Sequence, residues 1–236
     1  MEFDRIYAEV DLGRIEENMK AMKEHLRPGT KMYGVVKTDA YGHGAVPVAR
    51  TIDRFVCGYA VAAVDEGLKL RRHGIEKEIL CLGPVSAGRY QECLENDISL
   101  PMFEYQRAKE LSDAAVAEGK TAKIHIAVDT GMSRIGLFPD EGSVETVKEI
   151  AELPALRIAG MFTHFARADE ADKTKAGEQY RRFHAFCDAG KAAGVEVPVC
   201  HCSNSAGIVE LPDFNMDAVR AGITIYGLYP SDEGKQ

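Results

Sequence analysis

The sequence predicts an α/β fold, a (β/α)8 barrel of the TIM type, from three observations. Short apolar segments recur with the composition of parallel strands that are covered on both faces. Segments with helical spacing of apolar residues separate them, and 236 residues is a usual length for such a barrel. The strands are expected at residues 31–36, 58–62, 78–82, 98–101, 122–128, 157–162, 198–202 and 216–220. An open doubly wound sheet is the alternative, but its dinucleotide-type glycine turn is missing.

One helix is predicted before the first strand, at residues 12–26, and the others lie between strands. Met19 and Met22 belong to a row of apolar side chains spaced three or four positions apart, which is typical of a helix with one buried face. Gly74 and Gly194 follow predicted helices, where the backbone often turns left-handed. The helices between strands are expected at residues 45–54, 64–73, 87–95, 104–118, 143–152 and 173–193.

The two ends of the chain do not fit this alternation. Residues 6–12 alternate apolar and polar side chains, the pattern of a half-buried antiparallel strand. We therefore expect residues 1–11 to form a strand that pairs outside the barrel, with a C-terminal β domain that is absent from this chain. The barrel itself is expected at residues 12–231, with a tail at residues 232–236.

Charge and composition exclude several classes of protein. The net charge of −8 argues against a nucleic-acid partner and against an anionic membrane surface. No apolar run approaches the roughly 20 residues of a transmembrane helix, and the N-terminus lacks the features of a signal peptide. A cytoplasmic location is therefore expected.

The cysteines are expected to be reduced thiols, because they are scattered through a long chain without a secretory signal. Cys200, His201 and Cys202 suggest a metal site at first sight. In a strand, however, neighbouring side chains point to opposite faces, and no second pair of ligands stands at a suitable spacing. Buried strand cysteines are the better interpretation, and no metal is predicted.

The first predicted strand ends at Lys37, which Tyr41 and a glycine-rich turn follow at once. Enzymes of this fold keep their chemistry at the C-terminal ends of the strands. An amine fixed there can form a Schiff base with an aldehyde. An exposed lysine in an ordinary loop is the alternative for this residue considered alone.

Polar side chains also follow the later strands. Arg134 lies in the loop after the fifth strand, His164 follows the sixth, Asn204 and Ser205 follow the seventh, and Arg220 ends the eighth. Taken singly, these are compatible with a loop arginine, a core histidine and a helix cap. In a barrel the strand ends converge on one face, which favours a shared site.

These residues lie in strings that resemble the barrel domain of the alanine racemases, fold-type III enzymes that use pyridoxal 5′-phosphate (PLP). The most specific strings are VKTDAYGHG at residues 36–44, DTGMSRIG at 129–136 and NSA at 204–206, and the likeness covers nearly the whole chain. The resemblance implies a homodimeric isomerase that converts L-alanine to D-alanine for peptidoglycan.

The resemblance also implies roles for single residues. Lys37 would hold PLP through a Schiff base and act as one of two bases, and Arg134 and His164 would complete the catalytic set. Arg134 would position the substrate carboxylate or the phenolic oxygen of the cofactor. The cofactor-binding residues implied in this way are Lys37, Tyr41, Leu82, Arg134, His164, Asn204, Ser205, Arg220, Gly222 and Ile223.

Two groups of these residues would contact opposite parts of the cofactor. Tyr41, Ser205 and the backbone N–H groups of Gly222 and Ile223 would bind the phosphate, as loops after the last strands of barrels often do. Arg220 would face the pyridine nitrogen, with His164 bonded to it. Arginine is always charged and has no acceptor, so the nitrogen would stay unprotonated. The weaker electron sink would favour racemisation over transamination.

Two departures from the family bear on activity. Many members have a carbamylated lysine that braces the arginine, at the position of Ala127 here. Full-length members supply the opposite-face base as a tyrosine of the C-terminal domain, and Tyr226 and Tyr229 are not its counterparts. Since racemisation needs proton transfer on both faces of Cα, we expect this chain to bind PLP and to be nearly inactive.

Other functions compete with this interpretation. A serine or broad-specificity racemase would share the same barrel, and a single-domain PLP homeostasis protein would match the length. A scaffold barrel without PLP is a non-enzymatic alternative. The strings at residues 36–44 and 129–136 favour a racemase.

Overall fold

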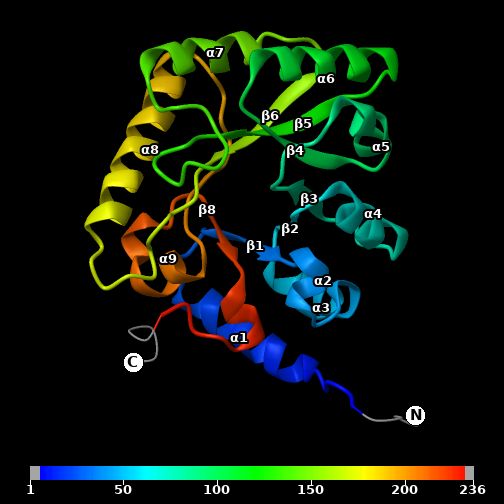
Figure 1. The fold of residues 1–236 in the computed structure, drawn as a ribbon, viewed down its shortest axis with the longest axis vertical. Helices are drawn as coiled ribbons and strands as arrows, with labels where there is room; N and C mark the ends of the chain where they lie inside the picture. The colour runs from blue at the N-terminus through cyan, green and yellow to red at the C-terminus, as the bar shows by residue number, and fades with distance from the viewer. Residues whose placement is uncertain (1–5, 232–236) are drawn as a thin grey trace.

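The computed structural model describes residues 6–231 and has the predicted architecture, a closed barrel of parallel strands in the order β1 to β8 (Figure 1). Strand β8 pairs with β1 and closes the barrel, with Tyr33 opposite Arg220. This closure brings the ends of the first and last strands side by side. The strands are β1 (Lys31–Val35), β2 (Gly58–Val61), β3 (Glu78–Cys81), β4 (Ile98–Met102), β5 (Ala122–Ala127), β6 (Leu156–Phe162), β7 (Cys200–His201) and β8 (Ala218–Ala221).

Helices surround the barrel, and α1 packs against α3, α9 and the 3-10 helix η4. None of the helices within residues 6–231 combines the length and the apolar character that a bilayer crossing requires. The α-helices are α1 (Leu12–His25), α2 (Lys37–Tyr41), α3 (Ala45–Ile52), α4 (Val64–Arg72), α5 (Tyr90–Glu95), α6 (Tyr105–Ala117), α7 (Glu141–Ala151), α8 (Thr174–Ala192) and α9 (Ser205–Glu210). The 3-10 helices are η1 (Asp53–Phe55), η2 (Ala87–Arg89), η3 (Pro212–Phe214) and η4 (Ile223–Tyr226).

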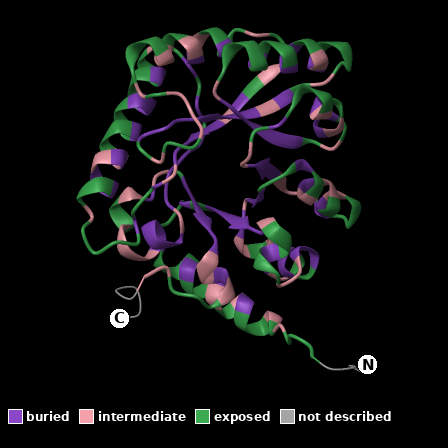
Figure 2. Cartoon of the chain, viewed as in Figure 1, coloured by how far each residue is buried: buried purple, intermediate pink, exposed green. Residues whose placement is uncertain are grey.

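The strands are buried almost throughout, and exposed residues gather on the outer faces of the helices (Figure 2). This distribution is the one expected for parallel strands that helices cover. The interior is not wholly apolar, because Ser99, His125, His201 and Arg220 are also buried inside the barrel. Such groups need hydrogen-bond partners within the protein.

The structure differs from the sequence-based expectation at both ends of the chain. Residues 6–11 form no strand here, and the Asp11 side chain instead accepts a hydrogen bond from Arg14 N and caps α1. The pairing of this segment with a second domain stays a prediction. Residues 1–5 of the predicted strand lie outside the described residues. The same holds for the predicted tail at residues 232–236.

Strand β7 is shorter than the predicted segment at residues 198–202. Pro198 has no N–H to donate to a neighbouring strand. Cys200 N donates to the side chain of Asp217 rather than to a strand carbonyl. The register between β7 and β8 is therefore reduced to the pair His201 and Ala218.

Candidate active site

A cavity of about 560 Å³ opens at the C-terminal ends of the strands. Every residue that the sequence placed in the site lies on its wall. They are Lys37, Tyr41, Leu82, Arg134, His164, Asn204, Ser205, Arg220, Gly222 and Ile223. The strand ends thus converge on one face, although the chemical role of each residue stays a prediction.

Element α2 begins at Lys37, separated from the end of β1 by one residue, and it is a left-handed turn rather than an ordinary α-helix. Thr38, Asp39, Ala40 and Tyr41 all have φ between 52° and 55°. A left-handed backbone costs roughly 1–2 kcal/mol for each residue that is not glycine. Strain of this kind persists only where the surroundings hold it, and it gathers at functional sites.

Side chains from α4 hold this turn in place. Glu66 Oε1 accepts from Thr38 N at 2.6 Å, while its other oxygen accepts from Ala62 N at 2.7 Å. The Asp39 carboxylate accepts from Ala45 N at 2.9 Å and from Lys69 Nζ at 2.8 Å. The turn thereby fixes Lys37 and Tyr41 on the cavity wall.

The amine of Lys37 is available for a ligand. Lys37 is partly buried, and its Nζ lies 5.7 Å from the centre of the Tyr41 ring. It makes no hydrogen bond or ion pair with any other residue among 6–231. A lysine on a cavity wall without a protein acceptor is free to bond covalently to an aldehyde.

Tyr41, Ser205 and Gly222 form a small polar cradle at one end of the cavity. A Cβ at position 222 would stand 3.3 Å from Tyr41 Oη and 3.6 Å from Ser205 Oγ, so glycine leaves this space open. Ser205 Oγ accepts from Gly222 N at 3.0 Å. Burial raises the pKa of Tyr41, so its hydroxyl stays a donor at neutral pH. The cradle suits the oxygens of a phosphate.

Arg220 is buried deep in the cavity wall, and both of its terminal nitrogens are engaged. Nη1 donates to His201 Nδ1 at 2.7 Å and to the His201 carbonyl at 3.1 Å. Nη2 donates to the carbonyls of Thr163 and Cys202 at 2.8 and 3.1 Å. Nε has no protein partner within the described chain, so it is left for a ligand in the cavity.

His164 lies beside Arg220, with Nδ1 3.3 Å from Nη2. Burial, and after it the charges of Arg220, Arg134 and Lys37, lower the pKa of His164 to about 3. The ring is therefore neutral at physiological pH. A neutral imidazole accepts from Arg220 at Nδ1 and can donate from its other nitrogen.

Arg134 stands in the loop between β5 and α7, which Asp129 organises. One oxygen of Asp129 accepts from Gly131 N at 3.0 Å and from Ser133 N at 2.9 Å. Arg134 itself is exposed and makes no hydrogen bond or ion pair with the described residues. Ala127 is buried at the end of β5, so no carboxylate or carbamate from that position braces the guanidinium.

The charges on the wall favour an anionic ligand. Lys37, Arg134 and Arg220 contribute three cations, against the single carboxylate of Asp169, which is exposed to solvent. Phe162 and Leu82 add apolar surface. A flat ring that carries a phosphate at one end fits this combination of a cationic wall, an apolar surface and a polar cradle.

Two other predictions concern nearby residues. The Tyr226 hydroxyl donates to the carbonyl of Val35 at 2.8 Å, and Tyr229 is 59% exposed. Neither tyrosine lines the cavity, and the origin of the second base stays a prediction. Among residues 6–231 no three side chains of the metal-ligating types converge, and His201 is instead bonded to Arg220.

Sequence reasoning missed several residues that shape the site. Thr224 bonds to Ser205 at 3.0 Å between the hydroxyl oxygens, and the Tyr226 ring lies 4.9 Å from that of Tyr41. Asn204 was assigned to the cofactor, but its side chain accepts from Gly207 N and caps α9. This is the helix-cap alternative that the sequence offers for Asn204, and a contact of Asn204 with the cofactor stays a prediction.

Comparison with known proteins shows which family this chain resembles. The model of the family described as "alanine racemase, N-terminal domain" matches residues 10–230. The alanine racemase of Clostridium novyi (strain NT) is 45% identical over 229 residues, which are 97% of this chain and 59% of that protein. That of Methanococcus maripaludis is 41% identical over 228 residues, 96% of this chain and 61% of that protein.

The chain is also similar to a solved structure of an alanine racemase. The alanine racemase of Clostridium difficile 630 in complex with cycloserine has a TM-score of 0.93 and 38% identity, covering 94% of this chain and 61% of that one. The present chain therefore spans less than two thirds of the length of these relatives.

Proposed function

Because this chain belongs to the family of alanine racemase N-terminal domains, we propose that it is the PLP-binding barrel of an alanine racemase, with Lys37 as the residue that carries the cofactor. The proposal depends chiefly on one observation. The amine of Lys37 stands without a protein acceptor on the wall of a cationic cavity whose far end is the cradle of Tyr41, Ser205 and Gly222.

In this proposal Lys37 transfers a proton and Arg134 binds the substrate. When bound, PLP supplies an electron-withdrawing ring that acidifies the α-proton of an attached amino acid. Lys37 would remove or return that proton on one face, since its amine lies at the strand end that faces the cavity. Arg134, without a bracing carboxylate, would hold the substrate carboxylate through charge-assisted hydrogen bonds.

Arg220 would set the reaction type. Its free Nε would face the ring nitrogen, and a guanidinium can only donate. The ring nitrogen would then stay unprotonated and withdraw electrons weakly. We therefore expect quick return of the proton to Cα, which favours racemisation over transamination.

A second base must act on the opposite face of Cα. Lys37 is the base that we assign among residues 6–231. Tyr41 is placed at the phosphate cradle, and His164 is bonded to Arg220. We propose that the second group comes from outside the described residues, as a tyrosine of a further domain in a cytoplasmic homodimer. The alanine racemases among the relatives favour alanine over serine as the substrate.

The test is an absorbance titration of the chain with PLP. A saturable band of a lysine-bound cofactor is expected, and Lys37→Ala should abolish it. Lys20→Ala is the matched control, because Lys20 is an exposed lysine on α1. No band in the unsubstituted chain, or the same band in Lys37→Ala, would refute the assignment.

A further inference from the structure

A line of hydrogen bonds runs from Arg220 through the interior of the barrel to Glu78, the first residue of β3. Arg220 Nη1 lies 2.7 Å from His201 Nδ1, and His201 Nε2 lies 3.1 Å from His125 Nδ1. His125 Nε2 lies 3.2 Å from Glu78 Oε1. The line thus connects the cavity wall with a carboxylate at the N-terminal end of a strand on another side of the barrel.

The direction of donation along this line follows from the chemistry of its ends. Arginine only donates, so His201 Nδ1 must accept and the proton of His201 sits on Nε2. That proton is donated to His125 Nδ1, which places the proton of His125 on Nε2. The last bond is then donated to Glu78, whose ionised carboxylate only accepts. Each link therefore donates away from Arg220 and toward Glu78.

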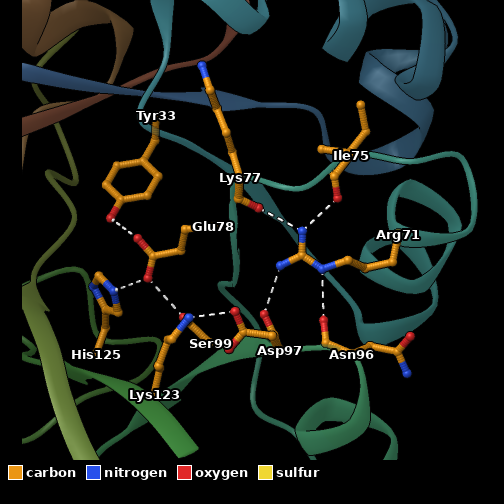
Figure 3. Close-up of polar contacts among 10 residues, drawn as sticks. All are labelled: Tyr33, Arg71, Ile75, Lys77, Glu78, Asn96, Asp97, Ser99, Lys123 and His125. Carbon is orange, nitrogen blue, oxygen red and sulfur yellow. Dashed lines mark hydrogen bonds and ion pairs between the residues drawn. The ribbon is translucent and has the colours of Figure 1, made fainter.

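Glu78 is held as a carboxylate by three donors (Figure 3). Tyr33 Oη donates at 2.7 Å and Ser99 Oγ at 2.8 Å, in addition to His125. Burial acts to raise the pKa of Glu78, but its interactions with His125, Tyr33 and Ser99 outweigh burial and hold that pKa below its usual range. The acceptor at the end of the line is therefore present at neutral pH.

The rings in the middle of the line are buried and packed. His125 and His201 are both fully buried. The Phe162 ring stacks on His201 with a centroid distance of 5.4 Å and an angle of 15°, and Tyr33 lies 5.4 Å away on an inclined plane. Burial, followed by the charge of Arg220, lowers the pKa of His201, so this ring is neutral. Its tautomer is set by its hydrogen bonds.

We propose that Glu78 is a positioning residue for Arg220: through His125 it fixes the tautomer of His201 that accepts from Nη1, and so keeps Nε free for the cavity. Without Glu78 the two imidazoles lose the acceptor that holds their protons on Nε2, and only the donor Nη1 of Arg220 still opposes a proton on His201 Nδ1. A proton on His201 Nδ1 would then oppose the N–H of Arg220, and the guanidinium would turn. This inference extends the proposed function, because the ring nitrogen is the group that Arg220 would meet.

The first test is independent of the cofactor. Nitrogen-15 spectra of the imidazole rings in the full chain, assigned with His125→Gln and His201→Gln, should show both histidines neutral and protonated at Nε2. Glu78→Met should shift protons to Nδ1, whereas Ser99→Ala removes a neighbouring bond to the same carboxylate and should change neither ring. A charged ring, a proton on Nδ1 in the unsubstituted chain, or unchanged rings in Glu78→Met would overturn the proposal. If Glu78→Met does not fold, the spectrum of the unsubstituted chain is the test, because it shows whether both rings are neutral and protonated at Nε2.

The second test measures the consequence at the cavity. With PLP-loaded chain and alanine, the ratio of pyruvate formed to α-protons exchanged reports how often the amino group stays on the cofactor. Glu78→Met should raise this ratio about tenfold, as expected for the loss of a hydrogen-bonded charge, and Ser99→Ala should not. An unchanged ratio in Glu78→Met would overturn the link to Arg220. Failure of the unsubstituted chain to bind PLP would instead refute the proposed function and leave the tautomer result standing.

Discussion

The Tyr226 hydroxyl donates to the Val35 carbonyl at 2.8 Å and so ties η4 to the last residue of β1. The same ring lies 4.9 Å from that of Tyr41 and stacks on His43 at 4.6 Å. One side chain thus supports both the strand that ends before Lys37 and the tyrosine of the cradle.

Removal of this hydroxyl should weaken the site without removing its ring contacts. In Tyr226→Phe the Val35 carbonyl loses its partner, a change worth about 1 kcal/mol. We expect PLP to bind roughly fivefold more weakly, measured by absorbance titration. Tyr229→Phe is the control, because Tyr229 is largely exposed. Equal affinities in the two variants would contradict this role.

Gly222→Ala should block the phosphate cradle. The added methyl group would stand 3.3 Å from Tyr41 Oη and occupy the space between it and Ser205. PLP affinity should fall at least about tenfold, the scale of losing a charge-assisted hydrogen bond. Gly88→Ala places its methyl group in open space and should bind PLP normally. Unfolding midpoints of both variants separate loss of the cradle from loss of the fold.

Glu66→Gln should loosen the left-handed turn that carries Lys37. Only one oxygen remains to accept, so either Thr38 N or Ala62 N meets an amide NH2 group in place of a carboxylate oxygen. The rate at which PLP attaches to Lys37 should fall about tenfold. Stopped-flow absorbance measures this rate. Asp65→Asn changes the neighbouring acid, which pairs with Arg89 on the surface, and should leave the rate unaltered. If both variants react alike, the turn does not depend on Glu66.

The pKa of Glu78 predicts an acid-dependent part of the stability. Burial raises this pKa, but the interactions with His125, Tyr33 and Ser99 lower it overall to about 2 from the usual 4.5. Its contribution is complete above pH 4.5 and is lost as the pH falls through the folded pKa near 2. Urea denaturation across this window should show a shallower pH slope for Glu78→Gln. Parallel slopes would contradict the assignment.

Racemisation by the 236-residue chain tests whether a second base is needed. With one base, deuterium from the solvent should replace the α-proton of one alanine enantiomer, while the opposite enantiomer accumulates far more slowly. Nuclear magnetic resonance follows the exchange, and polarimetry follows the accumulation. Equal rates of exchange and racemisation would place both bases within this chain.

The barrel could be predicted because its strands are short apolar runs and its helices have one apolar face. The site residues followed from strand ends and from strings at residues 36–44 and 129–136. The left-handed turn could not be predicted, because local preference opposes it and Glu66 and Lys69, which hold it, are distant in sequence. The line from Arg220 to Glu78 was missed for a similar reason. It depends on the register of separate strands, which short apolar patterns do not specify.

The turn after β1 also has a consequence for the order of folding. Its four left-handed residues oppose their own backbone preference by several kcal/mol in total, roughly the sum of 1–2 kcal/mol each. The groups that compensate are Ala45 N, Glu66 and Lys69, and all of them follow later in the chain. The segment therefore cannot adopt this shape until α3 and α4 have docked. A newly synthesised chain would therefore have to fold its barrel and these covering helices before it could bind its cofactor.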